Sequence, residues 1–161
     1  MYDPDTDSRV YTQHPDFAWS PSFDPDPNDT VQFDLRVAQD SGFAIGAEID
    51  SLTDTSHTLV LTLDTHRQYW WKVITRDNHG LTAESAVETF WTYAPGDVND
   101  SWAITSADII TLVSYIFKGQ PLWVPECVGN VNGDSTVNSA DIIWLVNTIF
   151  KGGAAPIPGC G

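Results

Sequence analysis

The sequence predicts a two-domain protein in which an all-β sandwich is followed by a small all-α domain of two loop–helix repeats. Three observations lead to this prediction. Residues 1–94 carry short runs rich in β-branched and aromatic residues, which turn sequences separate. Residues 95–161 contain two copies of one segment, 33 residues apart. The 161 residues are enough for two small domains, and a hydrophobic content of 42% is too high for a disordered acidic chain.

The strand prediction for residues 1–94 depends on alternation between apolar and polar side chains. From Thr30 to Ala38 the odd positions are Val, Phe, Leu and Val, and the even positions between them are Gln, Asp and Arg. Three further runs have a strand-forming composition: His57–Leu63, Gln68–Arg76 and Val87–Tyr93. Turn sequences lie between the runs at Asp24–Asp29, Asp40–Gly42 and Asp77–Gly80. Short strands at this spacing, without a helical period, are typical of a β-sandwich.

Three of these segments resemble strands of fibronectin type III domains. One run resembles strand F of that family, because it begins at Tyr69, has apolar residues at alternate positions and ends in Asp77-x-x-Gly80. Phe17–Pro21, with Trp19, looks like strand B, and Glu88–Thr92 looks like strand G. The resemblance covers about residues 11–94 and implies an immunoglobulin-like sandwich.

The strand that begins at Tyr69 separates its side chains onto two faces. A period of two places Tyr69, Trp71 and Val73 on one face, which we expect to lie in the core with Trp19. Trp70 lies on the opposite face. We therefore expect either that a long loop covers Trp70 or that it belongs to a contact surface.

The two copies in residues 95–161 each change from a loop into a helix. The first copy runs from Gly96 to Gly119 and the second from Gly129 to Gly152, and each ends in Lys-Gly, the composition of a helix end. Ser106 and Ser139 are the candidate N-caps. Six apolar residues per copy fall at helical spacing, and we expect the helices to bury these faces against each other. They are Ile109, Ile110, Leu112, Val113, Ile116 and Phe117, and then Ile142, Ile143, Leu145, Val146, Ile149 and Phe150.

Each loop carries oxygen-bearing side chains at positions 1, 3, 5, 9 and 12 and a backbone carbonyl at position 7, as in the calcium loop of an EF-hand. The expected ligands of the first loop are Asp97, Asn99, Ser101, the carbonyl of Ala103, Thr105 and Asp108. Those of the second loop are Asn130, Asn132, Asp134, the carbonyl of Thr136, Asn138 and Asp141. Because Ca²⁺ prefers six to eight hard oxygen ligands, the sequence predicts two calcium sites.

With one helix per repeat and Asp at position 12, the duplicated pattern of about residues 96–161 resembles a type I dockerin. This sequence departs from that pattern at Ser101 and Asn130, where Asp is expected, and at Trp102 and Ser135, where a sharp turn favours Gly. Each loop keeps two carboxylates, so we expect weaker calcium sites than in a fully acidic loop. Asp100 is a substitute ligand if the first loop is distorted. A degenerate loop that folds without metal is the alternative for each site.

The dockerin resemblance implies a calcium-ordered unit that binds a cohesin domain of another protein, with the β-sandwich as spacer or adaptor. The family's contacts come from loop positions 10 and 11 and from the following helix. Carried over to this sequence, they are Ser106, Ala107, Val113, Ser114 and Lys118, or Ser139, Ala140, Val146, Asn147 and Lys151. Because the repeats are nearly identical, either one can present the binding face.

Cys127 and Cys160 are the two cysteines, and they are also 33 residues apart. Each lies in a Pro-containing segment that follows a helix. We expect a disulfide that ties the end of the chain to the link between the repeats, with two free thiols as the alternative. A disulfide favours an oxidising compartment, so we expect a secreted or cell-surface protein whose signal peptide is not in this sequence.

The net charge is −15, and 18 of the 22 acidic residues are Asp. Nucleic acids and anionic membranes both attract basic surfaces, so this charge argues against either as a partner. The apolar runs are a handful of residues long, far short of the roughly 18 that a membrane span requires. We therefore expect neither nucleic-acid binding nor membrane insertion.

The sequence does not predict an enzyme. The four histidines, His14, His57, His66 and His79, share no metal-ligand spacing. A nucleophile elbow and a phosphate-binding loop are also missing from the sequence. The function that we expect is therefore a non-catalytic extracellular assembly or adhesion module.

Two alternatives to a cohesin-binding module stay open. One is a self-associating structural subunit of an extracellular filament or surface layer, which binds other copies of itself. The outward Trp70 favours it, as do Trp102, Trp123 and Trp144, because aromatic residues are enriched in interface cores. The other is a carbohydrate-binding module that uses exposed Trp side chains.

Overall fold

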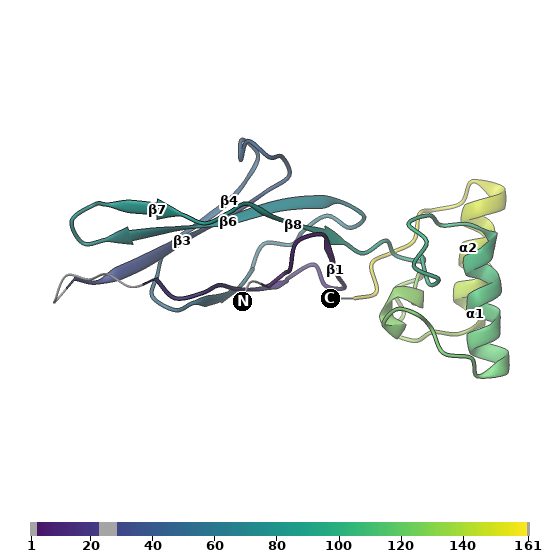
Figure 1. Cartoon of the computed structure of the whole chain (residues 1–161). Coiled ribbons are helices and arrows are strands. Elements are labelled where there is room, and N and C mark those ends of the chain that lie inside the picture. Colours follow the sequence, from purple (N-terminus) through teal and green to yellow (C-terminus); the bar gives the residue numbers. More distant parts are fainter. Residues whose placement is uncertain (1–2, 23–28, 161) are drawn as a thin grey trace. The chain divides into compact units, whose positions relative to one another are not determined.

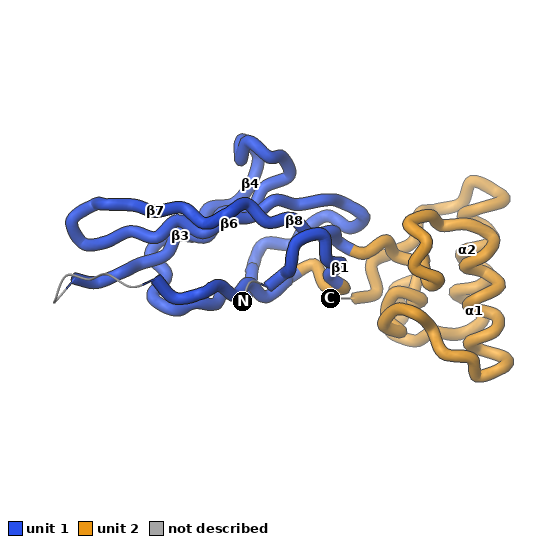
Figure 2. Tube along the Cα trace, in the orientation of Figure 1, with its two compact units in different colours: residues 1–10, 14–92 blue, residues 11–13, 93–161 orange. Residues whose placement is uncertain are grey.

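The computed structural model describes residues 3–22 and 29–160. The chain forms two compact units, which Figure 2 shows in different colours. The first unit holds the described residues up to Val10 and those from His14 to Thr92, and the second holds Tyr11–Gln13 and the described residues from Tyr93 onward. The units therefore divide after Thr92, whereas the sequence placed the boundary after residue 94. The turn expected at Asp24–Asp29 lies, apart from its last residue, outside the described residues.

The first unit consists of β-strands in two sheets (Figure 1). The six-stranded sheet has the order β1-β8-β6-β3-β4, with β7 paired to β6, and the two-stranded sheet pairs β2 with β5. The strands are β1 Ser8–Val10, β2 Asp16–Ala18, β3 Val31–Ala38, β4 Gly46–Leu52, β5 Ser56–Thr58, β6 Gln68–Asp77, β7 Thr82–Glu84 and β8 Glu88–Thr92. All pairs are antiparallel except β1 with β8.

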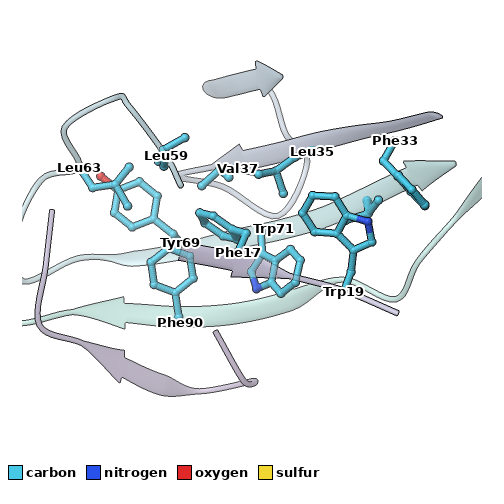
Figure 3. Packing of buried hydrophobic residues seen from close by; sticks show 11 residues of the cluster. Phe17, Trp19, Phe33, Leu35, Val37, Leu59, Leu63, Tyr69, Trp71 and Phe90 are labelled. Atoms are coloured by element: carbon cyan, nitrogen blue, oxygen red, sulfur yellow. The ribbon is translucent and has the colours of Figure 1, made fainter. Parts of the chain in front are cut away.

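One apolar core joins the two sheets (Figure 3). As the alternation predicts, Tyr69, Trp71 and Val73 of β6 are buried. Trp71 has no exposed surface, and its Nε1 donates to the carbonyl oxygen of Pro4 at 3.3 Å. Phe17 of β2 meets Trp71 edge to face, with 5.2 Å between ring centroids. Because Phe17 comes from the small sheet and Trp71 from the large one, the unit is a β-sandwich.

The structure corrects part of the strand prediction. The run His57–Leu63 is strand only within Ser56–Thr58, because the chain then leaves the sheet so that Leu59 and Leu63 reach the core. The strands β1, β4 and β7 were not expected. Trp70 is half-buried on β6, opposite Ala38 of β3.

The second unit contains the helices α1 (Ser106–Lys118) and α2 (Ser139–Lys151) and a short 3₁₀ helix, η1 (Glu126–Gly129). The expected N-caps are wrong by one residue, because Thr105 and Asn138 cap the helices with their own side chains. Each forms a capping box with an Asp three residues later, which satisfies N–H groups that the helix leaves unpaired. Both helices end at a Gly in the left-handed conformation, with φ of 64° and 65°.

The helices of the second unit pack around Leu112 and Leu145, which are fully buried together with Tyr93, Val98 and Val131. The expected buried face is too wide. Four of its residues are instead 61–67% exposed, and they occupy equivalent positions in the two repeats: Ile110, Phe117, Ile143 and Phe150. Six apolar residues in a helix of 13 spread over more of its circumference than one neighbouring helix covers.

Within the described ranges, no helix is long and apolar enough to cross a membrane.

Candidate functional site

The first of the two expected calcium loops folds around the side chain of Asp97. This buried carboxylate accepts hydrogen bonds from the backbone N–H of Ser101 to Oδ1 and of Trp102 to Oδ2, both at 2.8 Å. Ser101 N also donates to Asn99 Oδ1 at 3.2 Å, and Ser101 Oγ donates to the carbonyl oxygen of Ala103 at 3.1 Å. The oxygens at positions 1, 3, 5 and 7 therefore belong to one hydrogen-bonded turn.

Asp108, at position 12, connects this loop to α1. Its Oδ2 accepts from Thr105 N at 2.8 Å and its Oδ1 from Asn99 N at 3.3 Å. Burial raises the pKa of Asp108 above its usual value, and the negative charge of Asp97 acts in the same direction, whereas the hydrogen bonds from Thr105 and Asn99 lower it. The negative charge of Asp97 next to the buried Asp108 is one that a cation would neutralise.

The oxygens of the second loop are joined by side-chain hydrogen bonds. Asn132 Nδ2 donates to Asp134 Oδ2 at 2.9 Å, and Thr136 Oγ1 donates to Asp134 Oδ1 at 2.8 Å. Asn138 Nδ2 donates to Thr136 Oγ1 at 2.9 Å. The hydrogen bonds from Thr136 hold the pKa of Asp134 below its usual value, which favours the ionised form that a metal ligand requires.

Asp141 holds both ends of the second loop. This fully buried carboxylate accepts from the backbone N–H of Val131 at 2.9 Å and of Asn132 at 3.3 Å through Oδ1. Its Oδ2 accepts from Asn138 N at 2.9 Å. The residue at position 12 thus fixes the start of the loop against the start of α2.

Asn130 occupies the first ligand position of the second loop. Its side chain is buried, with 6% exposure of the residue, and its Oδ1 has no hydrogen-bond partner within residues 3–22 and 29–160. Buried amide oxygens in proteins nearly always have a partner. A hard cation is a suitable partner for this oxygen, and the carboxylate, amide and hydroxyl oxygens of the loop are the ligand types that Ca²⁺ prefers.

The turn expected at position 6 is present in both loops. Trp102 has a φ of 66° and Ser135 a φ of 71°, a left-handed conformation that non-glycine residues rarely adopt. Calcium loops place Gly at this position for the same sharp turn. Asp100, the substitute ligand considered for the first loop, is exposed and accepts a long hydrogen bond of 3.4 Å from Tyr11 Oη.

A third cluster lies in the first unit and was not expected from the sequence. Asp29, Asp77 and His79 are the one group of three or more His, Cys, Asp or Glu, among the residues described, whose ligand atoms lie within 4.8 Å of one another. His79 Nδ1 is 3.1 Å from Asp29 Oδ2, across a sequence separation of 50. Asp77 Oδ1 accepts from the backbone N–H of His79 and Leu81. The hydrogen bonds to Asp77 close the β6–β7 turn and account for the position of His79.

The residues that the resemblance implies as partner contacts are all exposed or half-buried on the two helices. The exposed ones are Ser106, Ala107, Lys118, Ser139, Ala140 and Lys151, and the half-buried ones are Val113, Ser114, Val146 and Asn147. The sequence assigned Ile110 and Phe117, with their counterparts in α2, to the buried face. Their exposure adds apolar surface to the same helices, and only the helix packing reveals it.

A pocket of about 300 Å³ lies at the end of α2. It is lined by Trp144, Asn147, Lys151, Gly153 and Ala154. Two hydrogen bonds fix its walls: Gly153 N donates to Asn147 O at 3.0 Å, and Thr148 Oγ1 donates to Ala154 O at 2.6 Å. Two of the expected partner contacts, Asn147 and Lys151, thus line this pocket.

Comparison with known proteins gives no family model and no curated protein that matches the chain. Among solved structures, α-L-rhamnosidase from Dictyoglumus thermophilum is similar to 58% of this chain and 12% of its own chain, with 18% identity and a TM-score of 0.48. An Fn3-like protein from Clostridium thermocellum is similar to 53% of this chain and 85% of its own, with 17% identity and a TM-score of 0.41. The two sheets of the first unit and the core between them define the β-sandwich on their own.

Proposed function

We propose that the second unit is a dockerin-like pair of EF-hand-like calcium-binding repeats in a non-catalytic, extracellular docking module. The observation that carries the proposal is the buried amide oxygen of Asn130 at the first ligand position of the second loop. A buried acceptor left without a donor costs about 1–3 kcal/mol, and Ca²⁺ would remove that cost. Burial and the negative charge of Asp97 raise the pKa of Asp108, which separately supports a cation in the first loop.

Two further observations support this proposal. The disulfide between Cys127 and Cys160 suits an oxidising compartment outside the cytosol. The first unit, a β-sandwich with strands at the positions where the sequence resembles a fibronectin type III domain, suits a spacer or adaptor. Ca²⁺ would neutralise the negative charge of the loops and coordinate several of their oxygens at once. The capping boxes of the two helices orient those oxygens.

Calcium binding is tested on the full chain by calorimetry, helical circular dichroism and hydrogen exchange. We expect two calcium ions per chain. Because a ligand that binds only the folded state stabilises it, excess chelator should partly unfold residues 96–161 and calcium should restore their helical signal. The β-sandwich should keep its exchange protection in both conditions. Identical melting and exchange in chelator and in millimolar calcium, with the disulfide intact and after its reduction, would contradict calcium binding.

The partner that we propose is a cohesin-like protein domain, and the pocket at the end of α2 favours the second repeat as the binding face. The repeats differ there, because Trp144 of the second repeat corresponds to Thr111 of the first. Lys118 and Lys151 are the two basic residues of residues 95–161, and Lys151 lines the pocket. A partner that presents an apolar side chain next to a carboxylate would complement Trp144 and Lys151.

This choice of face is tested with a panel of recombinant type I cohesin domains, titrated by calorimetry in calcium and in chelator. Lys151→Ala should weaken calcium-dependent binding at least tenfold, a loss of about 1.4 kcal/mol, whereas the matched variant Lys118→Ala should not. Equal effects of the two variants would contradict a preference for the second repeat. A monomeric, calcium-loaded chain that binds none of the domains would contradict cohesin recognition.

A self-associating structural subunit is the second candidate, and the exposed apolar residues of both helices favour it. Ile110, Phe117, Ile143 and Phe150 present two equivalent apolar surfaces on one unit. Contacts through two such surfaces would link copies of the chain into larger assemblies. Light scattering after size exclusion separates the candidates, because calcium-dependent multimers would support self-association and a monomer would support a separate partner.

A further inference from the structure

The last described residues, 153–160, run from the end of α2, where Gly153 N donates to Asn147 O, to the second loop, and we call this segment the strap. Ile157 N donates to the carbonyl oxygen of Val131 at 2.9 Å, directly after the first ligand position. Gly159 lies so close to the loop that a Cβ on it would be 2.3 Å from Cys127 O and 2.6 Å from Asn130 O. A side chain at position 159 would therefore force the strap away from Asn130.

The far end of the strap is held by a covalent bond and two hydrogen bonds. Cys160 is buried and forms the disulfide with Cys127. The backbone N–H of Cys160 donates to Tyr93 Oη at 3.1 Å, and Tyr93 Oη donates to the carbonyl oxygen of Cys160 at 3.0 Å. Because Cys127 lies three residues before Asn130, the disulfide closes the strap over the start of the second loop.

We infer that the strap is a positioning element which prepares Asn130 as the first calcium ligand of the second loop. This inference rests on the proposed calcium function. An amide oxygen carries no net charge, and in water it would keep its own hydrogen bonds rather than bind a cation. The strap shields Asn130 from water and fixes its backbone, so that its oxygen gains from binding a cation without first losing water.

The first loop does not need such an element. Its first ligand, Asp97, has a charged carboxylate that the N–H groups of Ser101 and Trp102 orient. Near this loop, the Cγ of Pro156 in the strap would be 3.5 Å from a Cβ on Gly96, one residue before the ligand. The strap should therefore govern calcium affinity in the second loop and hardly affect the first.

The test is a calcium titration of the full chain followed by two-dimensional NMR, which resolves the amides of both loops in one sample. Gly159→Ala keeps both cysteines and displaces the strap, and Pro158→Ala is the matched control at an exposed neighbouring position. We expect Gly159→Ala to weaken calcium binding by the second loop about tenfold or more, and the first loop by less than about threefold. Pro158→Ala should leave both affinities unchanged.

Removal of the disulfide gives a second, independent variant. Cys127→Ser with Cys160→Ser should produce the same selective loss, and Asn130→Asp in that background should restore most of the affinity, because a carboxylate binds calcium by its charge. Equal weakening of both loops would overturn the inference, since the strap would then only stabilise the unit. Unchanged affinity in the second loop would overturn it as well. If neither loop of the unmodified chain binds calcium, the proposed function fails together with this inference.

Discussion

Asp141→Asn tests whether the position-12 carboxylate holds the second loop to α2. The wild-type carboxylate accepts three backbone N–H groups, those of Val131, Asn132 and Asn138, at 2.9–3.3 Å. In the variant one oxygen becomes an NH₂ group, which cannot accept. At least one of these N–H groups therefore loses its acceptor and faces another donor.

The expected size of the effect follows from this geometry. A hydrogen bond to a charged group contributes about 1.5–3 kcal/mol, and a buried donor without an acceptor costs a similar amount. Allowing for rehydration of the half-exposed Asn132 and Asn138, we expect the free energy of unfolding of the second unit to fall by about 3 kcal/mol. That is a large part of the stability of a small domain, which is about 5–15 kcal/mol.

Asp100→Asn is the matched control, because it makes the same chemical change in the other loop. Asp100 is exposed, and both Asp and Asn tolerate its φ of 59°. We expect it to change the free energy of unfolding by less than about 0.5 kcal/mol. The measurement is urea unfolding of the full chain in excess chelator, followed by helical circular dichroism, to which α1 and α2 contribute. If Asp141→Asn stays within about 0.5 kcal/mol of wild type, the carboxylate does not hold the loop.

Three further predictions concern other parts of the chain. Ser135→Gly should raise the melting temperature of the second unit, because Gly adopts the left-handed φ of 71° without strain. The net gain in stability is about 1 kcal/mol after the conformational entropy cost of Gly is subtracted. A lower melting temperature would contradict this prediction. Trp71→Phe should destabilise the β-sandwich by about 2–3 kcal/mol, through a cavity and the lost bond to Pro4, with no change in helical circular dichroism. The N–H groups of Ile45 and its neighbours hold the pKa of Asp40 below 3.8. An NMR titration should therefore place its midpoint below 3.8, and the stability that Asp40 adds should be lost only as pH falls through that midpoint.

Local patterns account for the parts of the fold that were predicted well. Burial of Tyr69, Trp71 and Val73 follows from alternation along β6, because the period of a strand is set by its backbone alone. The helices α1 and α2 follow from apolar periodicity and from the Gly residues at their ends. The strands β1 and β7 were missed because each has only three residues, and β4, with seven residues, was missed because none of them is buried. Their pairing with distant strands forms them, and a local pattern does not contain that information.

The 33-residue period and the oxygen-bearing residues of the two loops are visible in the chain itself, because ligand type and spacing are local properties. Which side of each helix is exposed depends on the packing of the second unit, so the surface positions of Ile110 and Phe117 were not predicted. The same is true of Asn130. In the sequence it is a weaker ligand than Asp, whereas the folded chain buries its side-chain oxygen and brings Gly159, a residue distant in sequence, next to its backbone. Burial depends on contacts between segments distant in sequence, and it decides how strongly a neutral oxygen favours a cation.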